Sequence, residues 1–265
     1  MISVPSQFTW RDLQIHTDPE VYSPKPASLL LAEQAIERIQ PGERVLDACT
    51  GSGVVGLAVA RYVPGSTVTL ADLAVPALEA ARLNANINGL TLEVVRSDLY
   101  SSFAAASFDV VTVHPPAIPY SEHNDWGLSR GMRVATDGGN DGSALVVRSI
   151  VEARSLLRPG GRLLLLLPHW SHLGKARQAL VKSYITVQEL ARRPVEFFPA
   201  REGRLDERGL SHLRRLVAEG SIEMAFDGPV PTSVVSVVEA RLDPIAWIGS
   251  PAHQEQAGPA PADQI

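Results

Sequence analysis

The stretch from Val45 to Gly53 (Val-Leu-Asp-Ala-Cys-Thr-Gly-Ser-Gly) constrains the fold more than any other part of the chain. An apolar run ends near a carboxylate, Asp47, and small residues then lead into a helical run over 54–62. Glycine permits positive φ and a close approach of the backbone to a ligand. The start of a helix offers free N–H groups and a positive dipole end. A strand, a tight turn and a helix in this order predict a site for an adenosine-containing cofactor.

Two classes of cofactor compete for this turn. Gly51, Gly53 and Gly56 match the dinucleotide fingerprint, and Asp72 follows where a ribose-binding acid would stand. Dinucleotide strands, however, run almost directly into the first glycine, whereas here Asp47 lies at the tip of the strand. That carboxylate would repel a pyrophosphate and would stabilise an ammonium or sulfonium group. The turn therefore favours S-adenosylmethionine (SAM) over NAD.

Strand and helix signals alternate along the chain, which predicts an α/β fold with helices on both faces of a mostly parallel sheet. The expected strands cover 44–48, 66–71, 91–96, 108–113, 161–167, 184–193 and 233–242. The expected helices cover 27–39, 54–62, 75–88, 143–157, 172–182 and 206–219. The run Arg-Pro-Gly-Gly at 158–161 is typical of a helix end before a buried strand.

The predicted domain organisation has one cofactor-binding domain at 27–245. An irregular segment, 1–26, precedes it and could cover the cofactor or substrate. An insertion at about 197–230 separates the last two strands, and its helix either packs on the sheet edge or serves as a lid or dimer contact. The proline-rich tail at 251–265 is predicted to be disordered.

The composition narrows the class of protein. A net charge of −5 argues against a dedicated nucleic-acid binder. No apolar run approaches the ~20 residues that span a bilayer, and the first residues do not resemble a signal peptide. One cysteine allows no internal disulfide, and no metal-ligand spacing is present. We expect a cytoplasmic, metal-independent enzyme with no nucleic-acid or membrane partner, which could be a homodimer.

The cofactor turn resembles motif I of class I SAM-dependent methyltransferases, whose fold is a Rossmann-like, seven-stranded, mostly parallel sheet. The resemblance implies that Asp72 binds the ribose hydroxyls and that Asp98 accepts a hydrogen bond from the adenine amine. Asp72 could instead cap a helix, and Asp98 could be a turn residue. Tyr22 resembles an aromatic residue that covers the cofactor, and it could equally pack on the first helix. The other expected cofactor contacts are Cys49 (a small packing residue), Thr50, Gly51, Gly53, Leu73, Leu99 and His114.

The stretch His-Pro-Pro-Ala-Ile-Pro-Tyr at 114–120 resembles the Asn-Pro-Pro-Tyr motif of N-methyltransferases that act on planar amides and exocyclic amines. The stretches 135–142 and 156–162 resemble the release-factor glutamine methyltransferases, so the resemblance covers roughly 20–190. It implies that the residue at the motif's first position and the carbonyl of Pro115 orient the acceptor nitrogen.

Two departures from that family shape the expected acceptor. His114 replaces the motif's Asn and could act as a general base near pH 7 for an amine, or could be satisfied by backbone contacts alone. Ala117 replaces the motif's Tyr, which leaves Pro116, Ala117, Tyr120 and Trp126 as the expected substrate contacts. Only about 26 residues precede the first helix, where the family carries a helical recognition domain. We therefore expect a small-molecule acceptor, as in specialised metabolism.

Three uses of the site stay open at this point. The leading hypothesis is methyl transfer to a nitrogen of an amine-like or amino-acid-like small molecule. The alternatives are glutamine N5-methylation of a protein, and a non-methylating reaction that releases methylthioadenosine. Besides these three, a non-catalytic protein that only binds SAM is a fourth possibility.

Overall fold

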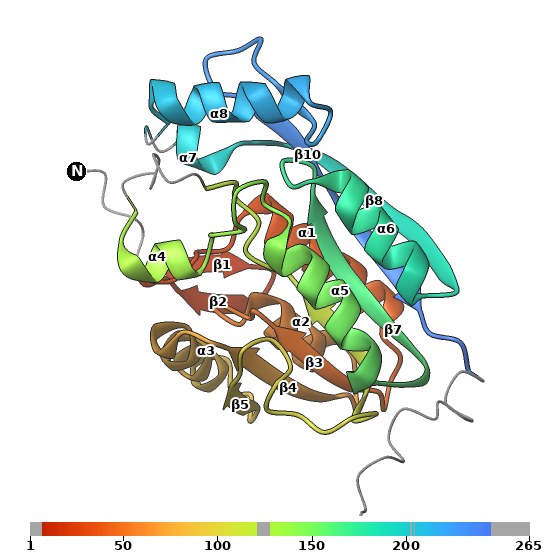
Figure 1. Ribbon diagram of the computed structural model, residues 1–265. Coiled ribbons are helices and arrows are strands. Elements are labelled where there is room, and N and C mark those ends of the chain that lie inside the picture. The colour runs from red at the N-terminus through yellow and green to blue at the C-terminus, as the bar shows by residue number, and fades with distance from the viewer. Residues whose placement is uncertain (1–6, 121–127, 202, 204, 245–265) are drawn as a thin grey trace, which may run out of the picture.

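The computed structural model describes residues 7–120, 128–201, 203 and 205–244. Within them, eight strands form one large sheet in the order β5-β4-β3-β6-β7-β10-β8, and β9 pairs with β10 (Figure 1). The predicted α/β fold with a mostly parallel sheet is confirmed, and β9, only two residues long, adds to the seven expected strands. The bounds of the strands are β3 Arg44–Ala48, β4 Thr67–Asp72, β5 Glu93–Arg96, β6 Phe108–Val113, β7 Leu157–Pro168, β8 Thr186–Glu196, β9 Met224–Ala225 and β10 Thr232–Arg241.

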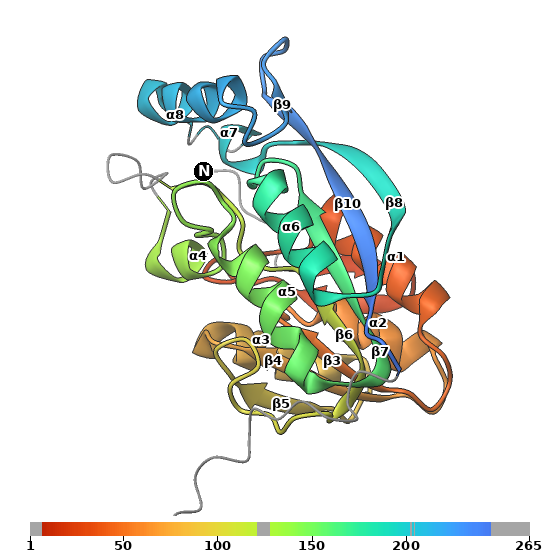
Figure 2. The ribbon, with the colours of Figure 1, turned by 45° about the vertical axis from the view of Figure 1, so that its right-hand side comes forward.

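The five strands from β3 to β7 run parallel, and β10 lies antiparallel between β7 and β8. Parallel strands are buried on both faces and are therefore apolar almost throughout. β7 shows this most clearly, since its five leucines, 163–167, are all buried. The strand begins at Leu157, earlier than expected, and a register shift against β6 accommodates the Pro-Gly-Gly stretch. Figure 2 shows β8 and β10 side by side, leading up to α7 and α8.

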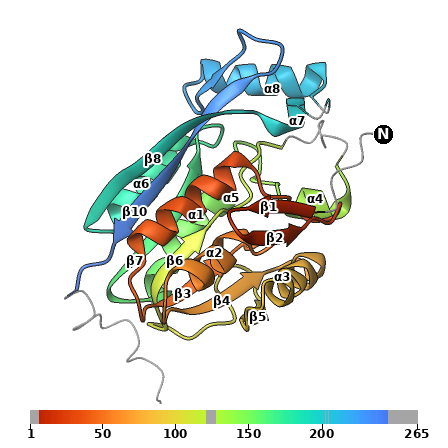
Figure 3. The ribbon, with the colours of Figure 1, turned by 180° about the vertical axis from the view of Figure 1, so that it is seen from behind.

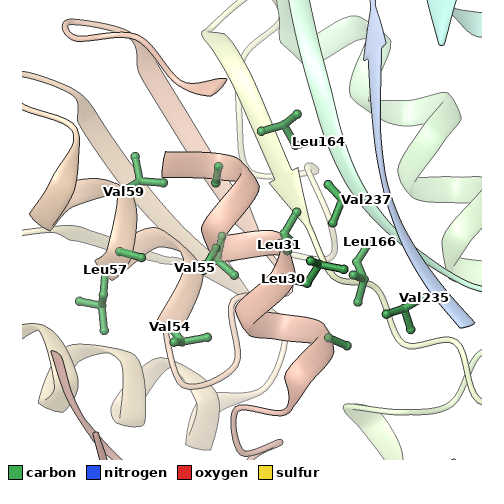
Figure 4. Packing of buried hydrophobic residues seen from close by; sticks show 14 of the residues in the cluster. Leu30, Leu31, Val54, Val55, Leu57, Val59, Leu164, Leu166, Val235 and Val237 are labelled. Carbon is green, nitrogen blue, oxygen red and sulfur yellow. The ribbon is translucent and has the colours of Figure 1, made fainter. Parts of the chain in front are cut away.

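Helices cover both faces of the sheet. On one face lie α1 (Pro26–Arg38), α2 (Val54–Tyr62) and α3 (Val75–Ile87), seen in front in Figure 3. On the other lie α5 (Ala144–Leu156) and α6 (Leu173–Ser183), seen in Figure 1. Figure 4 shows how Leu30 and Leu31 of α1 meet Leu164, Leu166 and the valines of β10. Each buried leucine contributes roughly 1.5–3 kcal/mol, so this packing fixes α1 on the sheet.

The N-terminal segment contains a hairpin, β1 (Gln7–Trp10) and β2 (Leu13–His16), where we expected irregular chain. Two asparagines of α3 hold it by its backbone. Asn84 Oδ1 accepts from the His16 N–H at 2.7 Å, while its Nδ2 donates to the carbonyls of His16 (3.1 Å) and Ser52 (2.9 Å). Asn88 exchanges the same pair of bonds with Gln14. Through Asn84, the hairpin is tied to the turn that follows β3.

The segment between β8 and β10 holds α7 (Phe198–Arg201), α8 (Glu207–Ala218) and β9. The expected helix at 206–219 is thus present, capped by the Asp206 side chain, which accepts from the Gly209 N–H at 2.8 Å. A short helix, α4 (Arg130–Val134), lies in the long loop after β6. No helix in the described part of the chain is long and apolar enough to cross a membrane. The tail predicted to be disordered, 251–265, lies outside the described residues.

Candidate active site

A cavity lies at the carboxyl ends of β3, β4 and β6, the edge where open α/β sheets bind ligands. It contains about 1070 Å³ of empty space, part of it open to solvent. This size suits a small molecule or cofactor. The predicted site residues that line it are Tyr22, Asp47, Cys49, Thr50, Gly51, Asp72, Leu73, Asp98, Leu99, His114, Pro115, Pro116 and Ala117.

The carboxylate of Asp47 organises the turn after β3. Its Oδ2 accepts from the Thr50 hydroxyl at 2.5 Å and from the Gly56 N–H at 3.0 Å, and its Oδ1 accepts from the Thr112 hydroxyl at 2.8 Å. Asp47 is only 2% exposed, and this burial raises its pKa to about 6, against the three hydrogen bonds that lower it. A cationic ligand beside this group would favour its ionised form.

Glycines let the turn close tightly around that carboxylate. Gly51 and Gly53 have φ of 55° and 88°, values that side chains disfavour. At Gly56, a Cβ would come within 2.1 Å of Leu70 Cδ2 and 3.1 Å of Asp47 Cβ. In the described structure, Gly53 shapes the turn and does not line the cavity, although we expected it to contact the cofactor. Burial raises the pKa of the Cys49 thiol well above its ordinary value, which fits a packing residue.

Asp72 ends β4, and its carboxylate accepts hydrogen bonds from two backbone N–H groups. Its Oδ1 accepts from the Ala74 N–H at 3.0 Å, just before α3, and its Oδ2 accepts from the Gly51 N–H at 2.9 Å. It therefore joins the start of α3 to the cofactor turn, and burial raises its pKa. Asp98 is half exposed and pairs with Arg148 of α5 at 3.2 Å. Leu73 is 46% exposed and Leu99 is buried with φ of 48°, and both line the cavity.

His114 follows β6 and lines the cavity, partly buried, with its Nδ1 3.4 Å from the Ser28 hydroxyl. The edge of its ring meets Tyr22 at 5.8 Å between centroids. Removal of water lowers the pKa of His114 to about 4. The imidazole is therefore neutral at pH 7, but it is too weak a base to deprotonate an ammonium group. The pKa does not support the predicted general base for an amine.

The loop at 135–142 folds back on the His-Pro-Pro-Ala stretch. The Ile118 N–H donates to Thr136 O at 2.8 Å, and the Gly138 N–H donates to Ile118 O at 2.9 Å. A Cβ at Gly138 would lie 2.6 Å from Ala117 Cα, and one at Gly142 would lie 2.4 Å from Ala117 O. Glycine is therefore required at both places, and the loop fixes position 117 in the cavity wall.

Tyr120 does not refill the space left at position 117. Its side chain is 5% exposed, with the hydroxyl 2.9 Å from Thr136 Oγ1 and the Arg133 guanidinium 5.5 Å from the ring centroid. It is not among the described residues that line the cavity, and its expected contact with the substrate stays a prediction. Trp126, the other candidate, lies outside the described residues.

Sequence reasoning missed two aromatic residues that do line the cavity, Trp170 and Phe198. Trp170 follows β7 beside His169. Both are buried, and His169 contacts Glu223 Oε2 at 2.7 Å and Ser236 Oγ at 3.0 Å. Phe198 begins α7. The position of Trp170 after a buried strand could have indicated that it lines the cavity. No local sequence pattern indicates the same for Phe198.

No group of three or more His, Cys, Asp or Glu side chains is arranged to hold a metal ion in the part of the chain that the structure describes.

Comparison with known proteins identifies the family. The model of the "Methyltransferase small domain" matches residues 12–127. A release factor glutamine methyltransferase of Gloeobacter violaceus is 39% identical over 165 residues, covering 59% of this chain and 57% of that protein. A "Putative protein N5-glutamine methyltransferase" of Methanocaldococcus jannaschii is 32% identical over 149 residues, covering 56% of this chain and 72% of that protein. The chain thus spans a little over half the length of the release factor enzymes that it matches.

Solved structures agree on the fold. The 16S rRNA N2 G1207 methyltransferase RsmC of Thermus thermophilus, solved with AdoMet and guanosine, gives a TM-score of 0.57 at 19% identity, covering 89% of this chain and 50% of that chain. A tRNA m1G37 methyltransferase of M. jannaschii gives 0.55 at 12% identity, covering 89% of this chain and 56% of that chain.

These comparisons correct one expectation and confirm others. The first relatives are named for a glutamine of a release factor or of another protein. The expected small-molecule acceptor, and with it a place in specialised metabolism, is therefore wrong. The predictions of a methyltransferase and of SAM as its cofactor are confirmed at the level of the family. The chain belongs to the class I SAM-dependent N-methyltransferases, in the protein N5-glutamine methyltransferase family that includes the release factor enzymes.

Proposed function

We propose that this protein methylates the side-chain amide nitrogen of a glutamine in a protein, with a release factor as the first substrate to test. The observation that carries the proposal is the 32–39% identity to relatives named for that reaction. A cytoplasmic location, expected from the single cysteine, is part of the same proposal.

The residues on the cofactor side fit SAM. The cavity has two carboxylates at its strand ends, the buried Asp47 and the half-buried Asp72, and a glycine turn between them. We assign the ribose hydroxyls to Asp72 and the adenine amine to Asp98, with Leu73 and Leu99 against the ring. Asp47 would stabilise the positive end of the molecule. When bound, SAM supplies a methyl group whose bond to sulfur breaks as the bond to nitrogen forms, leaving S-adenosylhomocysteine.

His114 suits an amide acceptor because of its low pKa. An amide nitrogen is hardly basic, so the enzyme must aim it rather than deprotonate it beforehand. If Nδ1–H donates to Ser28 Oγ, 3.4 Å away, Nε2 is left as an acceptor for one amide N–H, and the Pro115 carbonyl can take the other. A methylated amide that still carries its extra proton is far more acidic than an imidazolium of pKa about 4. A neutral His114 can therefore take that proton, and can later lose it to water at pH 7.

Positioning would supply much of the rate, because two reactants held in one pocket avoid the entropic cost of meeting. The chain positions the acceptor side rigidly. The 135–142 loop is hydrogen-bonded to Ile118, and Tyr22 packs edge-on against His114. These contacts support His114 and Pro115 in the lining of the cavity.

The proposal is tested by incubating the protein with SAM and a purified release factor, and analysing the products by mass spectrometry. We expect one methyl group on a single glutamine and an equal amount of S-adenosylhomocysteine. A release factor carrying Glu in place of that glutamine is the matched control and should stay unmodified. Methylthioadenosine as the product, or methylation confined to another residue type, would contradict the proposal.

A further inference from the structure

The cavity lacks an aromatic side chain at position 117, where related motifs carry Tyr, but three aromatic side chains from other positions line it. Tyr22, Trp170 and Phe198 all line it. They come from three separate parts of the chain: the segment before α1, the end of β7, and the start of α7. Of these, Phe198 belongs to the segment between β8 and β10, for which the sequence left packing on the sheet edge, a lid and a dimer contact open.

Ring contacts connect Phe198 to the acceptor end of the cavity. The Tyr22 ring meets Phe198 at 5.5 Å between centroids and His114 at 5.8 Å, edge-on in both cases. Edge-to-face pairs at such distances are favourable beyond the area they bury. The Lys25 ammonium also lies 5.2 Å from the Phe198 ring centroid. Phe198 therefore has a defined position, one ring away from His114.

The segment that carries Phe198 is fastened to the rest of the fold by hydrogen bonds on several sides. The Phe197 N–H donates to Pro231 O at 2.8 Å. His212 of α8 contacts Asn140 O at 2.7 Å, in the loop that backs Ala117. The Glu223 N–H donates to His169 O at 2.8 Å. These bonds fix the segment on the fold and so hold Phe198 in the cavity lining.

We propose that Phe198 supplies the aromatic contact for the acceptor amide that Ala117 cannot provide. A carboxamide is planar and packs well on an aromatic side chain, and Phe198 lines the same cavity as His114 and Ala117, in ring contact with Tyr22. The segment between β8 and β10 thus takes part in acceptor recognition. This inference rests on the proposed glutamine methylation and adds the residue that selects for a flat acceptor.

Three variants test the inference. Phe198→Leu keeps an apolar side chain of similar size but removes the ring, and Phe198→Tyr keeps the ring. Phe226→Ala is the matched control, because Phe226 lies in the same segment, beneath Arg214, and does not line the described cavity. The readouts are KM and kcat for the release factor, SAM affinity by calorimetry, and thermal unfolding to confirm that each variant is folded.

We expect Phe198→Leu to raise KM for the release factor about tenfold, with unchanged SAM affinity. Phe198→Tyr and Phe226→Ala should stay within about twofold of the parent protein. An unchanged KM in folded Phe198→Leu would overturn the inference, as would an equal loss of SAM affinity, which would place the ring against the cofactor. If the parent protein itself leaves the release factor unmodified, the proposed function fails, and this inference fails with it.

Discussion

SAM binding at pH 6 is expected to release about half a proton from Asp47. Burial holds the pKa of this carboxyl near 6, so it is about half protonated at that pH in the free protein. A unit positive charge 4 Å away is worth about 4 kcal/mol at an effective dielectric constant of ~20. That energy corresponds to roughly three pKa units. The bound state is therefore fully ionised at pH 6, and the lost proton must appear in the buffer.

The same linkage sets the pH dependence of affinity. The free protein must lose the Asp47 proton before it binds the cation, and a pKa near 6 leaves about a tenth of it ionised at pH 5 and half at pH 6. The Kd for SAM should therefore fall about fivefold from pH 5 to pH 6, and about twofold more by pH 8. Titration calorimetry in two buffers with different ionisation enthalpies measures the released protons directly.

Thr112 offers a way to assign the effect to Asp47. Its hydroxyl donates to Asp47 Oδ1 at 2.8 Å, and the residue is fully buried. Thr112→Val removes this bond to the ionised form, which should raise the pKa of Asp47 by about one unit. Proton release should then be about half a proton at pH 7 instead of pH 6. Thr112→Ser keeps the hydroxyl and should behave as the parent. Binding enthalpies that do not depend on the buffer at pH 6 would refute the reasoning.

Two further predictions concern the acceptor side and the N-terminal hairpin. At saturating SAM, kcat should not change with pH between 5.5 and 8 through titration of His114, because the pKa of this imidazole lies near 4. His114→Asn should show the same flat pH profile in initial-rate assays. A fall in kcat near pH 6.5 that disappears in the variant would contradict this prediction. Asn84→Ala should lower the free energy of unfolding, measured in urea, by about 2–4 kcal/mol. The reason is that the variant leaves backbone groups of His16 and Ser52 without their hydrogen-bond partner. A loss well under 1 kcal/mol would show that these bonds do not hold the hairpin.

The central sheet was predictable because its strands carry their own signal. Leu163 to Leu167 and Val110 to Val113 are buried, so their largely apolar runs follow from their positions in the sheet. Asp47 and Asp72 were placed correctly at strand ends because the carboxyl ends of parallel strands meet at one edge of a sheet.

The remainder depends on contacts that no local pattern encodes. β2 alternates apolar and polar residues over only four positions, too short a run to predict a strand, and it is held by Asn84 and Asn88, about 70 positions away. Phe198 lines the cavity in contact with Tyr22, which lies far earlier in the chain. The base strength of His114 depends on how far the assembled cavity excludes water. Each of these features arises only when distant segments pack together.

The position of β10 has a consequence for how this chain is made. β7 pairs with β6 as soon as both exist, but its other edge is closed by β10, which ends about 70 residues later. At ribosomal rates of about 5–20 residues per second, the gap is roughly 4 to 15 seconds. During that time a strand with five consecutive leucines presents an open edge, the kind of surface that pairs with other chains. Newly made protein is therefore most prone to aggregation just before β10 emerges. A stalled or shortened product that lacks β10 should need a chaperone to stay in solution.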